Sequence, residues 1–180
     1  MSELTKQEAQ ARIDLAAALR WTARLDLHEA VANHYSVVIG DGDDQEILLN
    51  PKLKHFSRVK ASDIVKFDLD ADDVLERPDA PDISAWYLHS HLHKHLPHAK
   101  VIFHTHMPNT LALACMKDFE FMMLDQNATR FYDRIAYDRD YNGLAMDDNE
   151  GERVASLMQD GKSVLFMGNH GVMILGETVS

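Results

Sequence analysis

The spacing of hydrophobic and polar positions along the chain predicts helices and short strands in alternation. Apolar residues recur at helical spacing over 6–23, which predicts an amphipathic helix. A β-branched run at 35–39 and an apolar run at 46–49 flank the turn-forming residues 40–44, so these segments predict a hairpin. Residues 64–69 alternate between apolar and polar side chains and predict a half-buried strand.

The rest of the chain continues this alternation. The acidic stretch 70–73 predicts a turn, after which 74–76 is expected to pair back on the preceding strand. Ser84 is expected to cap a helix over 85–95. The later elements expected are a strand at 101–106, a helix at 108–116, a strand or an irregular apolar segment at 119–124, a helical turn at 126–132, a strand at 135–137, a helix at 147–158 and strands at 163–167 and 172–175. Many strand connections are too short for parallel crossovers, so we predict an α/β fold, a three-layer α/β/α sandwich around a mostly antiparallel or mixed sheet.

Composition narrows the picture to one acidic domain. The chain has 180 residues, 46% of them hydrophobic, so a single domain over 1–180 is expected. Against 18 Lys and Arg residues stand 29 Asp and Glu, and the net charge of -11 argues against nucleic acid or an anionic membrane as a partner. No apolar run approaches the ~18 residues that span a bilayer. The single Cys115 and an N-terminus without a signal-like apolar core favour a reducing, cytoplasmic location.

Histidines are the most unusual feature of the composition, because seven of the 11 fall between His89 and His106. His104 and His106 close an apolar strand at positions i and i+2, so their side chains project from the same face. His170 follows a second apolar strand and precedes a glycine. If the three imidazoles converge, they form a zinc-type site with an open position. The alternative is that the pair is a coincidence at a polar strand end.

These motifs resemble the class II aldolase/adducin family. The motifs that carry the resemblance are, in chain order, Leu88-His89, 96–100, His104-Thr105-His106 and Asn169-His170-Gly171. The similarity extends over most of the chain, from about residue 15 to residue 175. Within the family, the segments 126–132 and 141–145 look more like the adducin-type branch than the sugar-phosphate aldolases.

The resemblance implies a metal-dependent, aldolase-like lyase that acts on a small carbonyl-containing substrate. In such enzymes a divalent metal, most often Zn²⁺, polarises a carbonyl and stabilises the enolate that forms when a carbon–carbon bond breaks. His104, His106 and His170 match the metal ligands, and Tyr141 falls near the family's tyrosine acid, with an ordinary loop aromatic as the alternative. The family often assembles as a tetramer with the metal at a subunit boundary, so a homo-oligomer is expected.

Departures from the family pattern bear on the reaction. Ala85 stands where active aldolases carry a glutamate that serves as base, and a methyl group cannot accept a proton. Asp82 and His89, on either side of it, are the candidates to replace that base. The family's phosphate-binding segments are replaced by 51–54 and 83–84, which argues against a phosphorylated sugar. The lysines of the first segment still offer charge to another anion.

A second function stays open from the sequence alone, a non-catalytic adducin-like interaction module that keeps the fold. Ala85 favours this alternative. The three retained histidines argue against it, because a scaffold gains nothing evident from a metal trio. Family members usually continue past the position of Ser180 with a helix that covers the site, so we expect this chain to be a fragment or to lack that closing helix.

Overall fold

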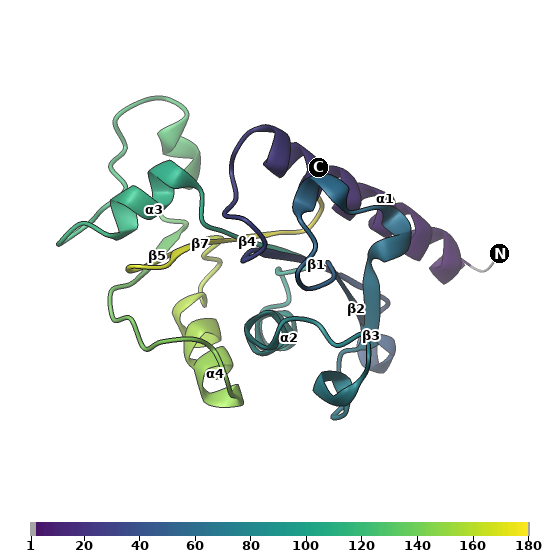
Figure 1. Cartoon of the computed structure of the whole chain (residues 1–180). Helices are drawn as coiled ribbons and strands as arrows, with labels where there is room; N and C mark the ends of the chain where they lie inside the picture. The colour runs from purple at the N-terminus through teal and green to yellow at the C-terminus, as the bar shows by residue number, and fades with distance from the viewer. Residues whose placement is uncertain (1–2, 180) are drawn as a thin grey trace.

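A seven-stranded mixed sheet forms the middle layer of the computed structural model, which describes residues 3–179 (Figure 1). The strand order is β3-β2-β1-β4-β7-β6-β5, and neighbours are antiparallel except β5 and β6, which are parallel. The strands are β1 (His34–Ile39), β2 (Glu46–Leu49), β3 (Val65–Asp68), β4 (Val101–Thr105), β5 (Ile135–Asp138), β6 (Val164–Met167) and β7 (Gly171–Gly176).

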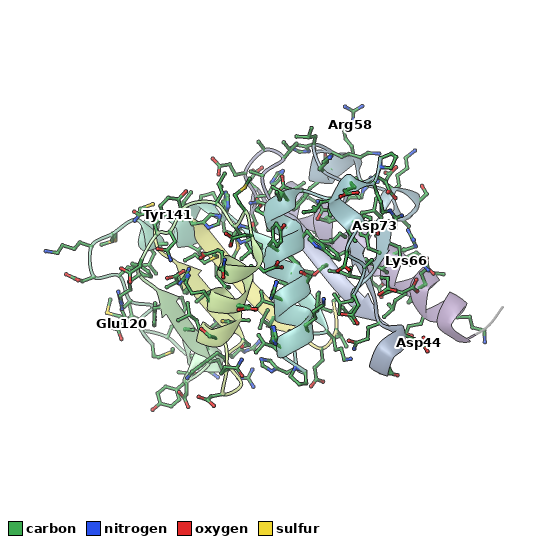
Figure 2. All side chains as sticks on the ribbon, turned by 90° about the horizontal axis from the view of Figure 1, so that it is seen from below. Asp44, Arg58, Lys66, Asp73, Glu120 and Tyr141 are labelled. Carbon is green, nitrogen blue, oxygen red and sulfur yellow. The ribbon has the colours of Figure 1, made fainter. Side chains whose placement is uncertain are left out.

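Helices cover both faces of this sheet. One face carries α1 (Glu3–Arg24) and α3 (Pro108–Ala114), and the opposite face carries α2 (Ile83–His95) and α4 (Asp148–Leu157) (Figure 1). Figure 2, viewed from below, shows α2 and α4 side by side over the sheet. Short 3-10 turns are η1 (Gly42–Asp44), η2 (Phe56–Arg58), η3 (Ala61–Asp63), η4 (Val74–Glu76) and η5 (Ala128–Phe131). The predicted α/β/α sandwich is therefore confirmed.

None of the helices within residues 3–179 combines the length and the apolar character needed to cross a membrane.

Alternation along β1 sorts its side chains between the two helical layers. Tyr35 and Val37 point to one face and pack in a cluster with Leu15 and Leu19 of α1. Val38 points to the other face and packs with Ala85 and its neighbours in α2. His34 and Ser36 lie at even positions as well, so the strand presents two polar side chains to the layer beneath α2.

The hydrophobic packing of α2 fixes its position on the sheet. Leu88 and Leu92 are at most 1% exposed and pack in one cluster with Ile102 of β4 and Leu165 of β6. Each such side chain stabilises the fold by roughly 1.5–3 kcal/mol relative to an exposed one. Residues one position further along the helix therefore face the neighbouring strip of the sheet, where β1 and β4 pair.

Residues 74–76 correct one prediction, because they form η4 and do not pair with β3. Val74 is 1% exposed and packs with Phe67 and Trp86. The chain then runs into Pro78, whose nitrogen has no hydrogen to donate to a ladder. The buried Val74 side chain and the nearby proline favour a turn, so β3 remains the edge strand of the sheet.

The apolar segment 119–124 is irregular and contains no strand. Phe119 and Phe121 pack against Phe166, with ring centroids 6.4 and 5.9 Å away. The Arg139 side chain donates a hydrogen bond of 2.7 Å to the Phe119 carbonyl oxygen. Side-chain contacts thus hold this segment without a backbone ladder, and of the two alternatives the irregular one is observed.

The start of α2 corrects a second prediction. Asp82 is the N-cap, and its carboxylate accepts a 2.9 Å hydrogen bond from the backbone N–H of Ser84. Ser84, which was expected to cap the helix, lies in its first turn. Aspartate and serine are comparable caps, so residue preference alone does not decide between two capping residues that lie so close together.

The close approach of α2 and α4 gives a prediction for Gly151. A Cβ atom at this position would lie 2.5 Å from the Tyr87 carbonyl oxygen and 2.5 Å from Cδ2 of His91, so the helices would have to separate. Gly151→Ala is expected to lower the free energy of unfolding by about 1–3 kcal/mol, despite alanine's better helix propensity. Urea unfolding measures the loss.

Ser156→Ala, on the exposed face of the same helix, is the matched control and is expected to stay within about 0.5 kcal/mol of the parent protein. A Gly151→Ala variant as stable as this control would contradict the steric account.

Candidate metal centre

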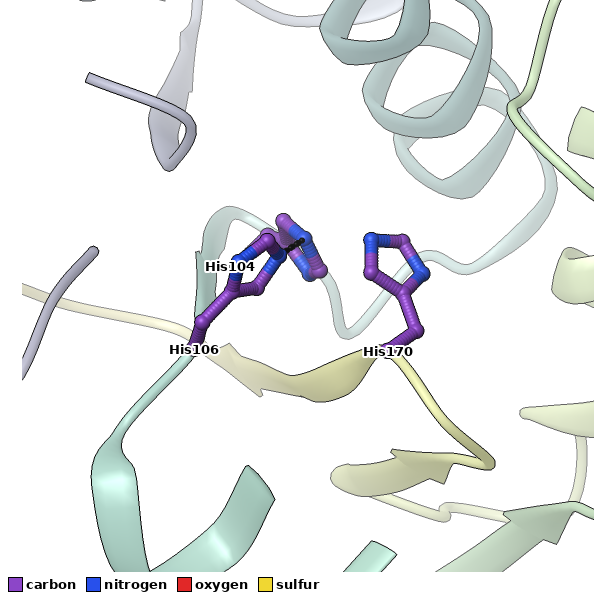
Figure 3. A group of neighbouring side chains, drawn as sticks. All are labelled: His104, His106 and His170. Carbon is purple, nitrogen blue, oxygen red and sulfur yellow. Dashed lines mark hydrogen bonds between the residues drawn. The ribbon is translucent and has the colours of Figure 1, made fainter. Parts of the chain in front are cut away.

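Three imidazoles converge at one end of the central strands. The ring centroids of His104 and His106 lie 5.0 Å apart, and His170 lies 4.7 and 5.0 Å from them (Figure 3). One ligand nitrogen from each of the three rings falls within 4.8 Å of the others. The convergence that the sequence left open is therefore observed.

Strand pairing produces this convergence. Thr105 at the end of β4 is paired with Val172 of β7, so His106, just after β4, lies opposite Gly171, the first residue of β7, and close to the turn that carries His170. His170 occupies the turn before β7, where Asn169 has a φ of 56°, a left-handed conformation that asparagine tolerates.

Gly171 lets the two segments approach. A Cβ atom there would lie 2.8 Å from Cδ2 of His106 and 2.9 Å from the Thr105 carbonyl oxygen. The Asn-His-Gly sequence thus permits both the turn and the contact with His106.

A carboxylate orients the outermost ring. Glu29 lies in the loop between α1 and β1, and its Oε2 is 2.7 Å from Nδ1 of His106. Because a carboxylate accepts, Nδ1 carries the hydrogen and the lone pair of His106 is left on Nε2. That Nε2 faces Nε2 of His104 at 3.0 Å. A carboxylate behind a histidine is the arrangement that holds metal-binding imidazoles in other proteins.

The cluster has the donor set and the protonation state that a divalent metal requires. Within the described residues the buried Nδ1 of His104 has no hydrogen-bond partner, so this ring's polar capacity is not filled by the protein. Burial lowers the pKa of His104 well below its usual value, and burial together with the nearby His106 lowers the pKa of His170 to about 4. Both rings are therefore neutral at pH 7, the form that binds metal, and the three histidines fit a zinc-type ion.

A cavity opens beside the three rings. It is lined by His106 and His170, by Asp82 and Ala85 at the start of α2, and by His34 of β1. Ala85 is 2% exposed and offers only its methyl group. The position at which the family resemblance places a glutamate therefore does face the cavity, and it contributes no proton acceptor there.

The three candidate proton-transfer residues lie in different settings. Tyr141 is 54% exposed on the loop before α4, with its ring centroid 6.4 Å from that of His170; it is labelled at the margin of the molecule in Figure 2. Asp82 lines the cavity while it caps α2. Burial alone would raise the pKa of Asp82. The hydrogen bonds from Ser84 and the nearby His34 outweigh burial and lower that pKa below its usual value, so the carboxylate is ionised.

His89 is fully buried, and both of its ring nitrogens are occupied. Nε2 lies 2.7 Å from Nδ1 of His34, and Nδ1 lies 2.5 Å from Oγ of Ser36. No lone pair of His89 is directed into the cavity. Besides His106 and His170, the cavity is lined by His34, which the sequence analysis did not single out. His34 could be recognised only from its pairing opposite His104. That pairing follows from the β1–β4 register, which the sequence alone does not give.

The two lysines of the loop after β2 also differ. Lys54 forms a 2.7 Å ion pair with Asp63. Lys52 lines the cavity, is exposed and forms no ion pair within the described residues. Of these two lysines, only Lys52 places a positive charge at the cavity.

Comparison with known proteins finds the same architecture elsewhere. The family model described as the Class II Aldolase and Adducin N-terminal domain matches residues 13–180. A Caulobacter vibrioides protein described as "Putative aldolase class 2 protein" is 31% identical over 99% of this chain and 68% of its own length. An adducin-related protein of Schizosaccharomyces pombe is 28% identical over 99% of this chain, which spans only 56% of that relative. Among solved structures, an aldolase II superfamily protein from Pseudomonas syringae is 29% identical with a TM-score of 0.85, over 99% of this chain and 70% of that one.

The buried histidines predict a pH-dependent stability for the metal-free protein. Burial lowers the pKa of His34 and of His93 to about 3, far below the value of roughly 6.5 in an unfolded chain. Above pH 6.5 both states are neutral, whereas between about pH 6.5 and 3 only the unfolded chain binds the protons. Stability is therefore expected to fall with falling pH by up to about 1.4 kcal/mol per pH unit for each ring.

Urea unfolding at neutral pH and at about pH 5 measures this slope. His93→Gln is expected to reduce it, and His95→Gln, an exposed residue of the same helix, is the control. An equal slope in the parent and in His93→Gln would contradict the assignment.

The Glu29 contact predicts an effect on metal affinity. Glu29→Gln removes the charged acceptor behind His106, so the affinity for Zn²⁺ is expected to fall about 10–100-fold. Competition with a coloured chelator measures it. Glu152→Gln makes the same charge change at an exposed position of α4 and is expected to leave the affinity unchanged. Equal losses in the two variants would point to overall charge and not to the contact.

Proposed function

Because the chain belongs to the class II aldolase and adducin family, we propose that it is a metal-dependent, aldolase-like lyase acting on a small carbonyl-containing substrate. The observation that carries the proposal is the convergence of His104, His106 and His170 beside a cavity. The chain spans 68% and 56% of the two curated relatives, so the activity of the whole protein is part of the proposal.

The three histidines would hold a divalent ion, with Zn²⁺ favoured because the ligands are all imidazole. Such an ion supplies Lewis-acid polarisation of a carbonyl oxygen and stabilises negative charge that develops there. Glu29 keeps the lone pair of His106 directed at the ion position. The cavity lined by His106 and His170 leaves room for a small substrate. Tyr141 lines a smaller hollow that shares His170 with it.

Proton transfer falls to residues around the cavity. The Tyr141 hydroxyl is exposed near His170 and can donate a proton to a substrate atom held at the histidines. The Asp82 carboxylate is ionised, and although its Oδ1 accepts from Ser84, its remaining capacity can orient water or accept a proton. The family's usual phosphate-binding segments are absent from this chain. Lys52 offers its positive charge to another anionic group of the substrate.

An adducin-like interaction module remains the second candidate. It is favoured by Ala85, which removes a proton acceptor from the cavity, and by the similarity to an adducin-related protein. The three converging imidazoles favour the lyase, because a scaffold has no use for them. Metal that binds without turnover of any aldol-type substrate would favour the module.

Two further proposals follow from the family. Members often assemble as tetramers with the site at a subunit boundary, so we propose a homo-oligomer. The acidic chain with one cysteine is proposed to work in the cytoplasm, without nucleic acid or a membrane as partner.

Removal of one ligand tests the lyase proposal. The purified protein is expected to carry about one divalent ion per chain and to cleave members of a panel of small hydroxycarbonyl compounds. His170→Ala is expected to lose both the ion and the cleavage, and His95→Ala, an exposed histidine outside the cluster, to keep both. Elemental analysis and a coupled aldehyde assay measure the two. A folded protein that takes up no metal would overturn the proposal.

A further inference from the structure

A line of buried polar side chains joins β1 to α2. His34 and Ser36 lie two apart on the strand, and His89 and His93 lie four apart on the helix, so each pair shares a face. All four residues are at most 6% exposed. The contacts run in sequence: His34 Nδ1 to His89 Nε2 at 2.7 Å, His89 Nδ1 to Ser36 Oγ at 2.5 Å, and Ser36 Oγ to His93 Nε2 at 2.7 Å.

The far end of the line fixes its direction. Nδ1 of His93 lies 2.5 Å from the carbonyl oxygen of Ala99, and a carbonyl can only accept a hydrogen bond. His93 therefore carries its hydrogen on Nδ1, and its Nε2 is bare and accepts from the hydroxyl of Ser36. Ser36 has one hydrogen, so its oxygen accepts from Nδ1–H of His89.

The same logic continues to the cavity. The Nε2 atom of His89 is bare and accepts from Nδ1–H of His34, which leaves Nε2 of His34 bare. Burial keeps these rings neutral, since it lowers the pKa of His34 and His93 to about 3 and that of His89 well below its usual value. Within the described residues, Nε2 of His34 has no hydrogen-bond partner and is not fully buried. It is therefore accessible from the cavity that His34 lines.

His34 is also next to the histidine cluster. Its ring stacks on that of His104 with 4.6 Å between centroids, and the two residues face each other across the β1–β4 ladder. Ala85, which has no polar atom in its side chain, lines the same cavity. A ligand held at the cluster would therefore find a polar group in His34 and none in the side chain of Ala85.

We propose that His93, Ser36 and His89 act as positioning residues that set the tautomer of His34, so that His34 Nε2 accepts a hydrogen bond from a hydroxyl group of a small molecule bound at the histidine cluster. This inference deepens the proposed function and rests on it for the location of the ligand. A bare imidazole nitrogen accepts from O–H and repels an unprotonated oxygen, so the ligand class is a hydroxyl compound that presents its O–H beside the metal-binding oxygen. Lys52, at the mouth of the same cavity, suits a ligand that also carries a carboxylate.

Ser36→Ala is the variant that tests the chain. Without the hydroxyl, Nδ1–H of His89 has no acceptor, so His89 is free to move its hydrogen to Nε2 and His34 must then carry its own hydrogen on Nε2. The cavity would meet a donor in place of an acceptor. Ser90→Ala is the matched control, because Ser90 is a 4% exposed serine of α2 whose hydroxyl bonds the Trp86 carbonyl and takes no part in the line.

The first measurement is the proton–nitrogen correlation spectrum of the metal-free protein with labelled histidine rings. In the parent protein and in Ser90→Ala, the rings of His34, His89 and His93 are expected to carry hydrogen on Nδ1 alone. In Ser36→Ala, His34 and His89 are expected to show hydrogen on Nε2. Hydrogen on Nε2 of His34 in the parent protein overturns the proposal, and this spectrum decides even if Ser36→Ala does not fold.

The second measurement is the binding of glycolate and of acetate to the Zn²⁺-loaded protein by calorimetry, since the two differ by the hydroxyl. One hydrogen bond is worth about a fivefold to tenfold preference. Relative to the parent protein, that preference is expected to be lost in Ser36→Ala and kept in Ser90→Ala. An equal preference in the parent and Ser36→Ala, or no glycolate binding to the Zn²⁺-loaded parent, overturns the acceptor role. A Zn²⁺ titration of each variant tests the proposed function separately. If the proposed function fails, the protein binds no Zn²⁺ although the histidine tautomers are as expected.

Discussion

The pairing of β4 with β1 on one side and with β7 on the other is the constraint on which the site depends. The first ladder sets His104 opposite His34, and the second brings the end of β4 against the turn that carries His170. Residues more than 60 positions apart in the chain become neighbours through backbone hydrogen bonds alone. A register shift of one residue would turn His104 to the opposite face and separate it from the other rings.

The layer beneath α2 combines two kinds of packing. Leu88 and Leu92 are buried among apolar side chains, and one position further along, His89 and His93 are buried among polar ones. Burying polar groups costs free energy unless each is hydrogen-bonded, and here every ring nitrogen of the two helical histidines has a partner. A satisfied polar strip of this kind specifies one rotation of the helix, because any other would leave nitrogens without partners.

Much of the fold was predictable from local pattern, and the parts that were not have identifiable causes. Helices with strong periodicity, such as the one ending at Leu157, and strands flanked by turn residues were found within a few positions. The segments 74–76 and 119–124 were harder, because apolar residues that are buried through rings or in a turn look like short strands. For the site, His104, His106 and His170 were predictable from spacing, whereas the position of His34 at the cavity depends on strand register. His89 was expected as a candidate base, and its burial and its two hydrogen-bond partners follow only from the docking of α2.

The contact between Glu29 and His106 links the ion position to a loop that has no helix or strand of its own. The same loop is tied to β4 through the hydrogen bond that the Thr105 hydroxyl donates to the Leu27 carbonyl. Thermodynamic linkage is reciprocal, so a loop conformation that strengthens cation binding is itself stabilised by the cation to the same extent. Protection of the segment between α1 and β1 would then report whether the histidines hold an ion. The segment would be more protected from proteolysis and hydrogen exchange with the ion bound than without it.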